Sequence, residues 1–139
     1  MKKIEKKFEL GGKTITLTTG ILAEQADSAV MARCGDTVVL ATVTSAPLKI
    51  DLDYFPLSVE YQEKLYAGGK IKGSRWVKRD GRPTDEEILT ARLIDRSIRP
   101  LFSKTYKREV QIIVTVLSVD GENSPSTLGA IAASAAVHT

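Results

Sequence analysis

Cationic side chains and one aromatic ring carry the clearest chemical signal in this chain. Residues 70–100 contain nine of the 20 Lys and Arg residues and five acidic residues, so this stretch has a charge of +4. The whole chain has a formal net charge of +3, and the remainder is therefore slightly acidic. A positive charge this localised indicates an anionic partner, most simply a nucleic-acid phosphate backbone.

The first half of this stretch combines the side chains that single-stranded nucleic acid needs. Trp76 is the only tryptophan, and Arg75, Lys78 and Arg79 flank it. Cations follow the phosphates while an aromatic face stacks on a base, at roughly 1–3 kcal/mol per base. Nearby glycines predict a surface loop. The alternative is that Trp76 folds back over the core and that the charges are only solvated.

A helix is predicted to follow the loop. Thr84 and Glu87 have the spacing of a capping box, and Pro100 ends the helix. We expect a broad buried stripe from the apolar residues at helical spacing. These are Ile88, Leu89, Ala91, Leu93, Ile94, Ile98 and Leu101.

Three arginines of this helix share another face, because Arg92, Arg96 and Arg99 recur at i, i+4 and i+7. They form either an anion-binding rail or an ordinary solvated face that Asp95 partly neutralises. The spacing leaves both interpretations open.

Catalytic chemistry finds little support in the residues. Asp51 and Asp53 could share a cation if their backbone is extended, but a solvated loop is the simpler interpretation. A single Cys34 and a single His138 argue against a zinc site. His138 has no assignable catalytic partners, and Cys34 alternates like a small strand residue. No phosphate-binding glycine motif is present, so the residues predict no catalytic and no metal-binding group.

Length and composition are typical of one globular domain. The chain has 139 residues, 42% of them hydrophobic and 27% charged. It has no long apolar run and no signal peptide, and its one cysteine suits a reducing compartment, so we expect a cytoplasmic protein without a membrane partner. A small-residue helix expected from Ser124 stops without an end signal, so we expect a fragment of a longer protein.

The predicted elements indicate an α+β fold. Strands are expected over 2–9, 13–18, 28–34, 37–44, 55–61 and 110–119, and helices over 84–99 and from 124 onward. Gly35 and Asp36 predict a hairpin. The apolar run from Val38 to Val43 predicts a central strand covered on both faces. Strands predominate early and helices late, so we expect a mixed or largely antiparallel sheet with helices packed on one face.

Three blocks of the sequence, residues 33–44, 55–69 and 81–102, resemble the first RNase PH-like core domain of bacterial polynucleotide phosphorylases. The resemblance covers essentially all of residues 1–139, and the third block is the most specific. It implies a single N-terminal RNase PH-like core, with a ribosomal-protein-like β/α fold, at the start of a longer multidomain enzyme.

The resemblance also implies an activity for the whole enzyme. Enzymes of the family that this chain resembles degrade single-stranded RNA from its 3′ end with inorganic phosphate and Mg²⁺. They release nucleoside diphosphates, run in reverse as polymerases, assemble as ring-shaped homotrimers and can join RNA-degradation complexes. Their phosphate-binding and metal-binding residues lie in a second core. The present chain would therefore be inactive alone and would supply RNA-channel and trimer contacts.

Two other roles for the chain stay open. It is either a purely structural assembly module without RNA contact, or a fragment with phosphorolytic activity of its own.

Individual residues match the family pattern. Trp76, Val77, Lys78 and Arg79 match a Phe-Phe-Arg-Arg loop that grips RNA in the channel, and Arg82 matches the arginine of the Gly-Arg-Pro that follows. The chain departs from the pattern at Val77, which is not aromatic, and by the additional Arg75.

The three helix arginines also match the family. Arg92, Arg96 and Arg99 correspond to arginines of the family helix, in which a proline stands where this chain has Ser97. We infer that they lie near RNA or phosphate.

Overall fold

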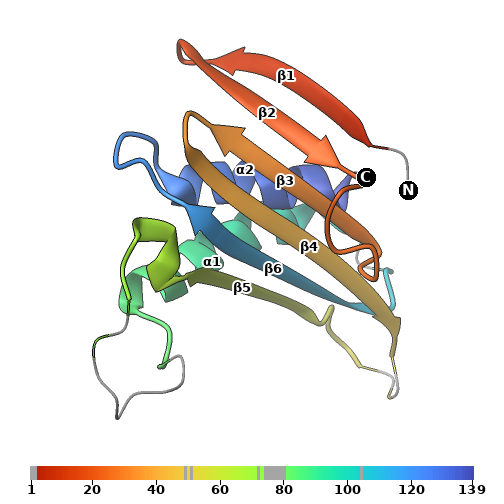
Figure 1. Ribbon diagram of the computed structural model, residues 1–139. Coiled ribbons are helices and arrows are strands. Elements are labelled where there is room, and N and C mark those ends of the chain that lie inside the picture. The colour runs from red at the N-terminus through yellow and green to blue at the C-terminus, as the bar shows by residue number, and fades with distance from the viewer. Residues whose placement is uncertain (1–2, 49, 51, 72, 74–80, 104) are drawn as a thin grey trace.

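Six strands form one mixed sheet, and two α-helices pack on one of its faces (Figure 1). The computed structural model describes residues 3–48, 50, 52–71, 73, 81–103 and 105–139. The strands are β1 Ile4–Leu10, β2 Lys13–Thr19, β3 Ser28–Cys34, β4 Thr37–Pro47, β5 Leu57–Glu63 and β6 Arg108–Ser118. The helices are α1 Asp85–Ile98 and α2 Pro125–Val137, with 3₁₀ turns η1 Leu65–Gly68 and η2 Arg99–Leu101.

The strand order confirms the predicted α+β class. The sheet runs β1-β2-β3-β4-β6-β5, and every neighbouring pair is antiparallel except β5 and β6, which are parallel. Parallel neighbours need a crossover connection, and α1 lies within the one between β5 and β6. The strand β5 therefore forms one edge of the sheet and lies against α1.

Local sequence signals place the ends of several elements as predicted. The Thr84 side chain accepts a hydrogen bond from the Glu87 N–H, and the Glu87 side chain accepts one from the Thr84 N–H, which completes the capping box. Ser124 caps α2, with Pro125 in its first turn. The predicted hairpin joins β3 to β4, and Gly35 in its turn has a φ of 60°.

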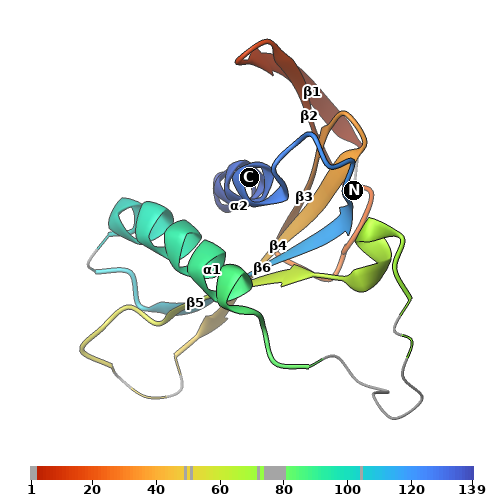
Figure 2. The same cartoon turned by 90° about the vertical axis from the view of Figure 1, so that its left-hand side faces the viewer.

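Small residues let α2 lie close to the sheet. Figure 2 shows both helices on the same side of the sheet, with α2 beside β3 and β4 and α1 beside β5. Gly129 faces the sheet, and a Cβ atom there would lie 3.0 Å from Val114 Cγ1 and 3.2 Å from Tyr61 Cε2. Within the described part of the chain, neither helix is long and apolar enough to cross a membrane.

The prediction that the strand now labelled β4 is covered on both faces is wrong. Val39, Ala41 and Val43 are buried on the helix side, whereas the residues between them are half-buried. Among the described residues, helices pack on only one face of the sheet, so the apolar run here belongs to a central strand with one face covered by helices.

The broad buried stripe expected on α1 is also wrong. Ile94 and Ile98 are buried and Ala91 is half-buried. The other members of the expected stripe are exposed, at 44% for Ile88, 66% for Leu89, 60% for Leu93 and 65% for Leu101. The single sheet contacts a narrow face of the helix, so the flanking apolar residues face outward.

The carboxylate of Asp120 joins two turns that are far apart in sequence. It accepts hydrogen bonds from the N–H groups of Glu122 and Asn123 (2.9 Å each), from the hydroxyl of Thr37 (2.9 Å) and from the N–H of Asp36 (3.2 Å). The bonds from Asn123 are the largest cause that holds the Asp120 pKa well below its usual range, and burial opposes them. Asp120 thereby fixes the turn before α2 against the β3–β4 turn.

We predict that Asp120→Asn lowers thermal stability at neutral pH, because an amide cannot accept all of these bonds. The Asp120 pKa is lower in the folded state than in the unfolded state. Its stabilisation is therefore fully present above the unfolded value, about 4, and is lost as pH falls through the folded value. Thermal unfolding between about pH 7 and about pH 2.5 should show the gap between wild type and variant narrowing in acid.

Glu122→Gln is the matched control for this experiment, because only the backbone of Glu122 joins the cluster. A gap between wild type and Asp120→Asn that stays constant with pH would show that the ionised carboxylate is not the stabilising group.

Candidate nucleic-acid interface

The predicted RNA-binding residues divide into those that the structure describes and those that it does not. Arg75, Trp76, Lys78 and Arg79 lie outside the described residues. Arg82 is described and exposed, two residues before the cap of α1. The predictions for the four loop residues therefore stay predictions.

The position of Arg82 depends on a carboxylate that bridges α1 and β5. Glu87 Oε1 accepts a hydrogen bond from the Glu63 N–H (2.7 Å), and Oε2 accepts one from the Thr84 N–H (2.6 Å). Burial opposes the ionisation of Glu87, but the bonds from Glu63 and Thr84 outweigh it and lower the pKa. The end of β5 and the start of α1 are thus held together, and Arg82 lies beside this junction, two residues before the N-cap Thr84.

A hollow of about 360 Å³ lies at this junction. Arg82 lines it, together with Gln62, Lys64 and Leu65. Two carboxylate residues, Glu63 and Glu87, also line it, so the charges of Arg82 and Lys64 are balanced there and the hollow by itself indicates no anion site.

Arg92 and Arg96 are exposed on α1, as the helical spacing predicts. Within the part of the chain that the structure describes, no hydrogen bond or ion pair joins either guanidinium to another residue. Arg92 lines a groove of about 670 Å³ between β5 and α1. Both guanidinium groups can therefore bind an anion without first breaking an internal contact.

Arg99 differs from the other two arginines because internal partners engage its guanidinium. Nε and Nη2 donate to the two carboxylate oxygens of Asp95 at 3.0 and 2.6 Å. Nη1 donates to the carbonyl of Phe55 at 3.0 Å, and Nη2 donates to the carbonyl of Leu57 at 3.1 Å. The hydrogen bonds that Arg99 donates to Asp95 are the main cause that raises the Arg99 pKa.

These contacts make Arg99 a structural link. It connects the end of α1 to the segment that enters β5, and its guanidinium carbon lies 6.0 Å from the Phe55 ring centroid. Phe55 in turn packs against Phe102 and Tyr106. The sequence offered Asp95 as a neutralising partner on this helix, but it gave no signal that Arg99 also binds the carbonyl groups of Phe55 and Leu57.

The remaining candidates from the sequence form no site together. Asp53 is exposed, and Asp51 lies outside the described residues. Cys34 is buried, with its Sγ 3.4 Å from Asn123 Oδ1. The exposed His138 has its Nδ1 2.8 Å from the Ser134 carbonyl. Among the described residues, no three His, Cys, Asp or Glu side chains gather to hold a metal ion.

A family model and related sequences both indicate one protein family for this chain. Residues 11–139 match the family model described as the 3′ exoribonuclease family (RNase PH), domain 1. The chain is 55% identical to the polyribonucleotide nucleotidyltransferase of Pelagibacter ubique over 137 residues, which are 98% of this chain and 20% of that protein. It is 57% identical to that of Roseiflexus castenholzii over 131 residues, which are 94% of this chain and 17% of that protein.

Solved structures show the same fold at lower sequence identity. A chain from the Archaeoglobus fulgidus exosome with RNA bound to the active site aligns with a TM-score of 0.66 and 21% identity, covering 88% of this chain and 50% of that one. Rice Rrp46 aligns with a TM-score of 0.66 and 18% identity, covering 89% of this chain and 54% of that one.

These matches also show how much of its relatives' length the chain spans. It spans about a fifth of the length of the related nucleotidyltransferases and about half of the solved relatives. On the evidence of the family match over residues 11–139, the chain belongs to the RNase PH family of 3′ exoribonucleases, as its first domain.

Proposed function

We propose that this chain is the N-terminal RNase PH-like part of a phosphate-dependent 3′-to-5′ exoribonuclease, and that it holds single-stranded RNA. The whole enzyme would convert RNA and inorganic phosphate to nucleoside diphosphates, reversibly, and would act as a homotrimer in the cytoplasm. The identity of 55% to a polyribonucleotide nucleotidyltransferase over 98% of the chain carries this proposal.

The charge distribution supports a role in RNA binding. The exposed Arg82, Arg92 and Arg96 accompany the cations of residues 70–79 along the sequence. Cationic side chains that have no internal partner can neutralise phosphates and release counterions, which is the main source of sequence-independent affinity. Trp76 would add stacking on a base. Three copies around a threefold axis would multiply these contacts along one strand.

The chemistry of cleavage would be performed elsewhere in the longer protein. Among the described residues, no group of three or more His, Cys, Asp and Glu side chains gathers to hold a metal ion. The family resemblance assigns the phosphate-binding and metal-binding residues to a second core, so we assign no catalytic residue to this chain. Its contribution is positional, because RNA held here keeps the 3′ end at a high effective concentration near the catalytic site between cleavages.

A purely structural role is the second candidate, and Arg99 is the observation that favours it. This residue matches an arginine of the family helix, yet it binds Asp95 and two carbonyl groups instead of facing an anion. We therefore withdraw Arg99 from the proposed RNA contacts and keep Arg92 and Arg96.

The double variant Lys78→Ala with Arg79→Ala tests the RNA-holding role. In the full-length enzyme it should weaken RNA binding and reduce processivity on long RNA, because fewer phosphates are neutralised. Cleavage of dinucleotide-sized substrates should be unchanged, since these do not reach the loop. Lys3→Ala with Lys7→Ala removes the same charge from two exposed positions, one in β1 and one just before it, and is the matched control. An equal loss on long and short substrates would refute the proposal.

Alanine variants of the helix arginines should separate into two classes. Arg92→Ala and Arg96→Ala should each weaken RNA binding by about 0.2–1 kcal/mol, as expected for an exposed charge, and leave stability unchanged. Each should also reduce the salt dependence of binding by about 0.7 in the log–log slope.

Arg99→Ala should instead lower the free energy of unfolding by about 1 kcal/mol, because it leaves Asp95 and two carbonyl groups without their donor. Chemical denaturation and RNA titration of the three variants measure both properties. Loss of RNA binding by Arg99→Ala without loss of stability would contradict this division.

A further inference from the structure

The outer edge of β5 carries backbone groups that no strand of this sheet uses. β5 is the last strand of the sheet, and it pairs only with β6. Alternate residues of a strand direct both of their backbone groups to the same side. The Val110 N–H donates to the Pro56 carbonyl, which fixes this alternation. The residues that direct their backbone groups away from β6 are Leu57, Val59, Tyr61 and Glu63.

Side chains of α1 occupy the two ends of this outward row. At one end, Arg99 Nη2 donates to the Leu57 carbonyl at 3.1 Å. At the other end, Glu87 Oε1 accepts a hydrogen bond from the Glu63 N–H at 2.7 Å. A long strand of another sheet therefore cannot pair along the whole of β5, because both ends of the row are already bonded.

The middle of the row is open. Among the residues that the structure describes, the N–H and C=O groups of Val59 and Tyr61 have no hydrogen-bond partner. They can form a ladder of hydrogen bonds with another extended chain. Leu57 and Glu63 are six residues apart, or about 20 Å at about 3.3 Å per residue. The space between the bonded ends therefore suits an extended segment of about six residues.

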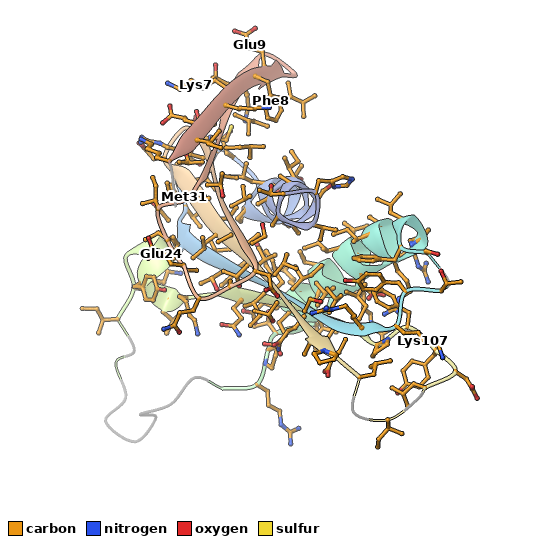
Figure 3. All side chains as sticks on the ribbon, turned by 90° about the vertical axis from the view of Figure 1, so that its right-hand side faces the viewer. Lys7, Phe8, Glu9, Glu24, Met31 and Lys107 are labelled. Atoms are coloured by element: carbon orange, nitrogen blue, oxygen red, sulfur yellow. The ribbon has the colours of Figure 1, made fainter. Side chains whose placement is uncertain are left out.

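The opposite edge of the sheet is protected in a different way. β1 contains Lys6 and Lys7, and the ion pairs of Lys3 and Lys7 with Glu5 surround it with charge. Figure 3 shows Lys7 and Phe8 on opposite sides of this strand. Lysines on an edge strand oppose pairing with another chain, whereas β5 contains neither Lys nor Arg. Of the two edges, β5 is therefore the one that can accept a further strand.

A groove of about 670 Å³ between β5 and α1 runs beside the open part of this edge. This volume lies within the range of about 300–1,000 Å³ that is typical of ligand-binding clefts. Val59 and Ala91 line the groove and are half-buried, and Ile88 lines it with 44% of its surface exposed. An apolar side chain of a peptide that pairs with β5 would cover these three residues.

The charges that line the groove favour a peptide over RNA. Three acidic and two basic residues line it, so its net charge is −1. They are Glu60, Glu87, Asp95, Arg92 and Arg99. A polyanion gains little from such a lining, and RNA has no alternating N–H and C=O groups to pair with Val59 and Tyr61. An extended peptide without net negative charge matches both the backbone row and the apolar wall.

We propose that β5 binds a short extended peptide as an additional strand of the sheet. The peptide spans about six residues, carries no net negative charge and places an apolar side chain against Ile88 and Ala91. Its backbone forms the ladder with Val59 and Tyr61, so affinity comes from main-chain hydrogen bonds and selectivity from the groove. The proposal does not depend on RNA binding by this chain.

Peptide selection on the full-length protein tests the proposal. The probe is a phage-displayed library of random peptides of about ten residues, which is longer than the open part of β5. Enriched peptides are synthesised, and hydrogen–deuterium exchange of the protein is measured with and without each one. At least one peptide should slow exchange of the Val59 and Tyr61 amides by about tenfold or more, because a hydrogen-bonded amide exchanges only after opening.

A scan of single N-methyl groups along such a peptide tests the ladder itself. A methyl group that replaces a paired N–H should weaken binding by about tenfold, and one at the residue between two paired residues should change it by less than about twofold. The matched control is thus contained in the same peptide, since its N–H groups point alternately toward β5 and away from it.

Two variants of α1 test the position of the peptide. Ile88→Gln should weaken binding by about fivefold or more, because it removes apolar contact in the groove. Leu89→Gln is the matched control, since Leu89 is 66% exposed and does not line the groove. Should Ile88→Gln fail to fold, the N-methyl scan on the wild-type protein decides alone.

Three results would overturn the proposal. The first is a selection in which no enriched peptide slows exchange in residues 57–63. The second is an N-methyl scan without alternation along the peptide. The third is slowed exchange of residues 57–63 with single-stranded RNA but with no peptide, since the groove would then belong to RNA.

Discussion

The carboxylate of Asp120 is the contact on which the arrangement of sheet and helices most depends. It ties the turn before α2 to the turn between β3 and β4, so the position of α2 and the register of the central strands are fixed together. The space around it is tight, because a Cβ atom on Gly35 would lie 2.7 Å from both Asp120 Oδ2 and Asn123 Nδ2. With a φ of 60°, position 35 favours glycine for its backbone as well as for its surroundings.

A second set of contacts fixes α1 against the edge of the sheet. Some charged residues of this region take part in these contacts, and others are exposed. Glu87 bonds the Glu63 N–H at one end of β5, and Arg99 bonds the Leu57 carbonyl at the other. Both bonds go to backbone groups of an edge strand, which would otherwise face water or another strand. The charges used in this way hold the fold together, whereas Arg92 and Arg96 remain open to solvent and to an anion.

The sequence predicted those features that depend on neighbouring residues. The capping box of Thr84 and Glu87, the Gly35 turn and the strand alternation are local, and all are present. The sequence did not predict the features that depend on which other elements pack against a helix or strand. The exposure of Leu89 and Leu93 depends on how many layers cover α1, and the role of Arg99 depends on carbonyl groups more than 40 residues earlier in the chain.

We propose that this domain holds RNA as part of a larger phosphorolytic enzyme, and Trp76 gives the most direct test. It is the sole tryptophan of the chain, so its fluorescence reports on the basic stretch during titration with single-stranded RNA at several salt concentrations. If the domain holds RNA, RNA should quench Trp76 saturably, and the affinity should fall as salt rises, with a log–log slope of about 0.7 per neutralised phosphate. In the full-length enzyme, the fluorescence change of the wild type minus that of Trp76→Phe gives the contribution of Trp76. Trp76 fluorescence that RNA leaves unchanged at low salt, in both the isolated chain and the full-length enzyme, would contradict the RNA-holding role.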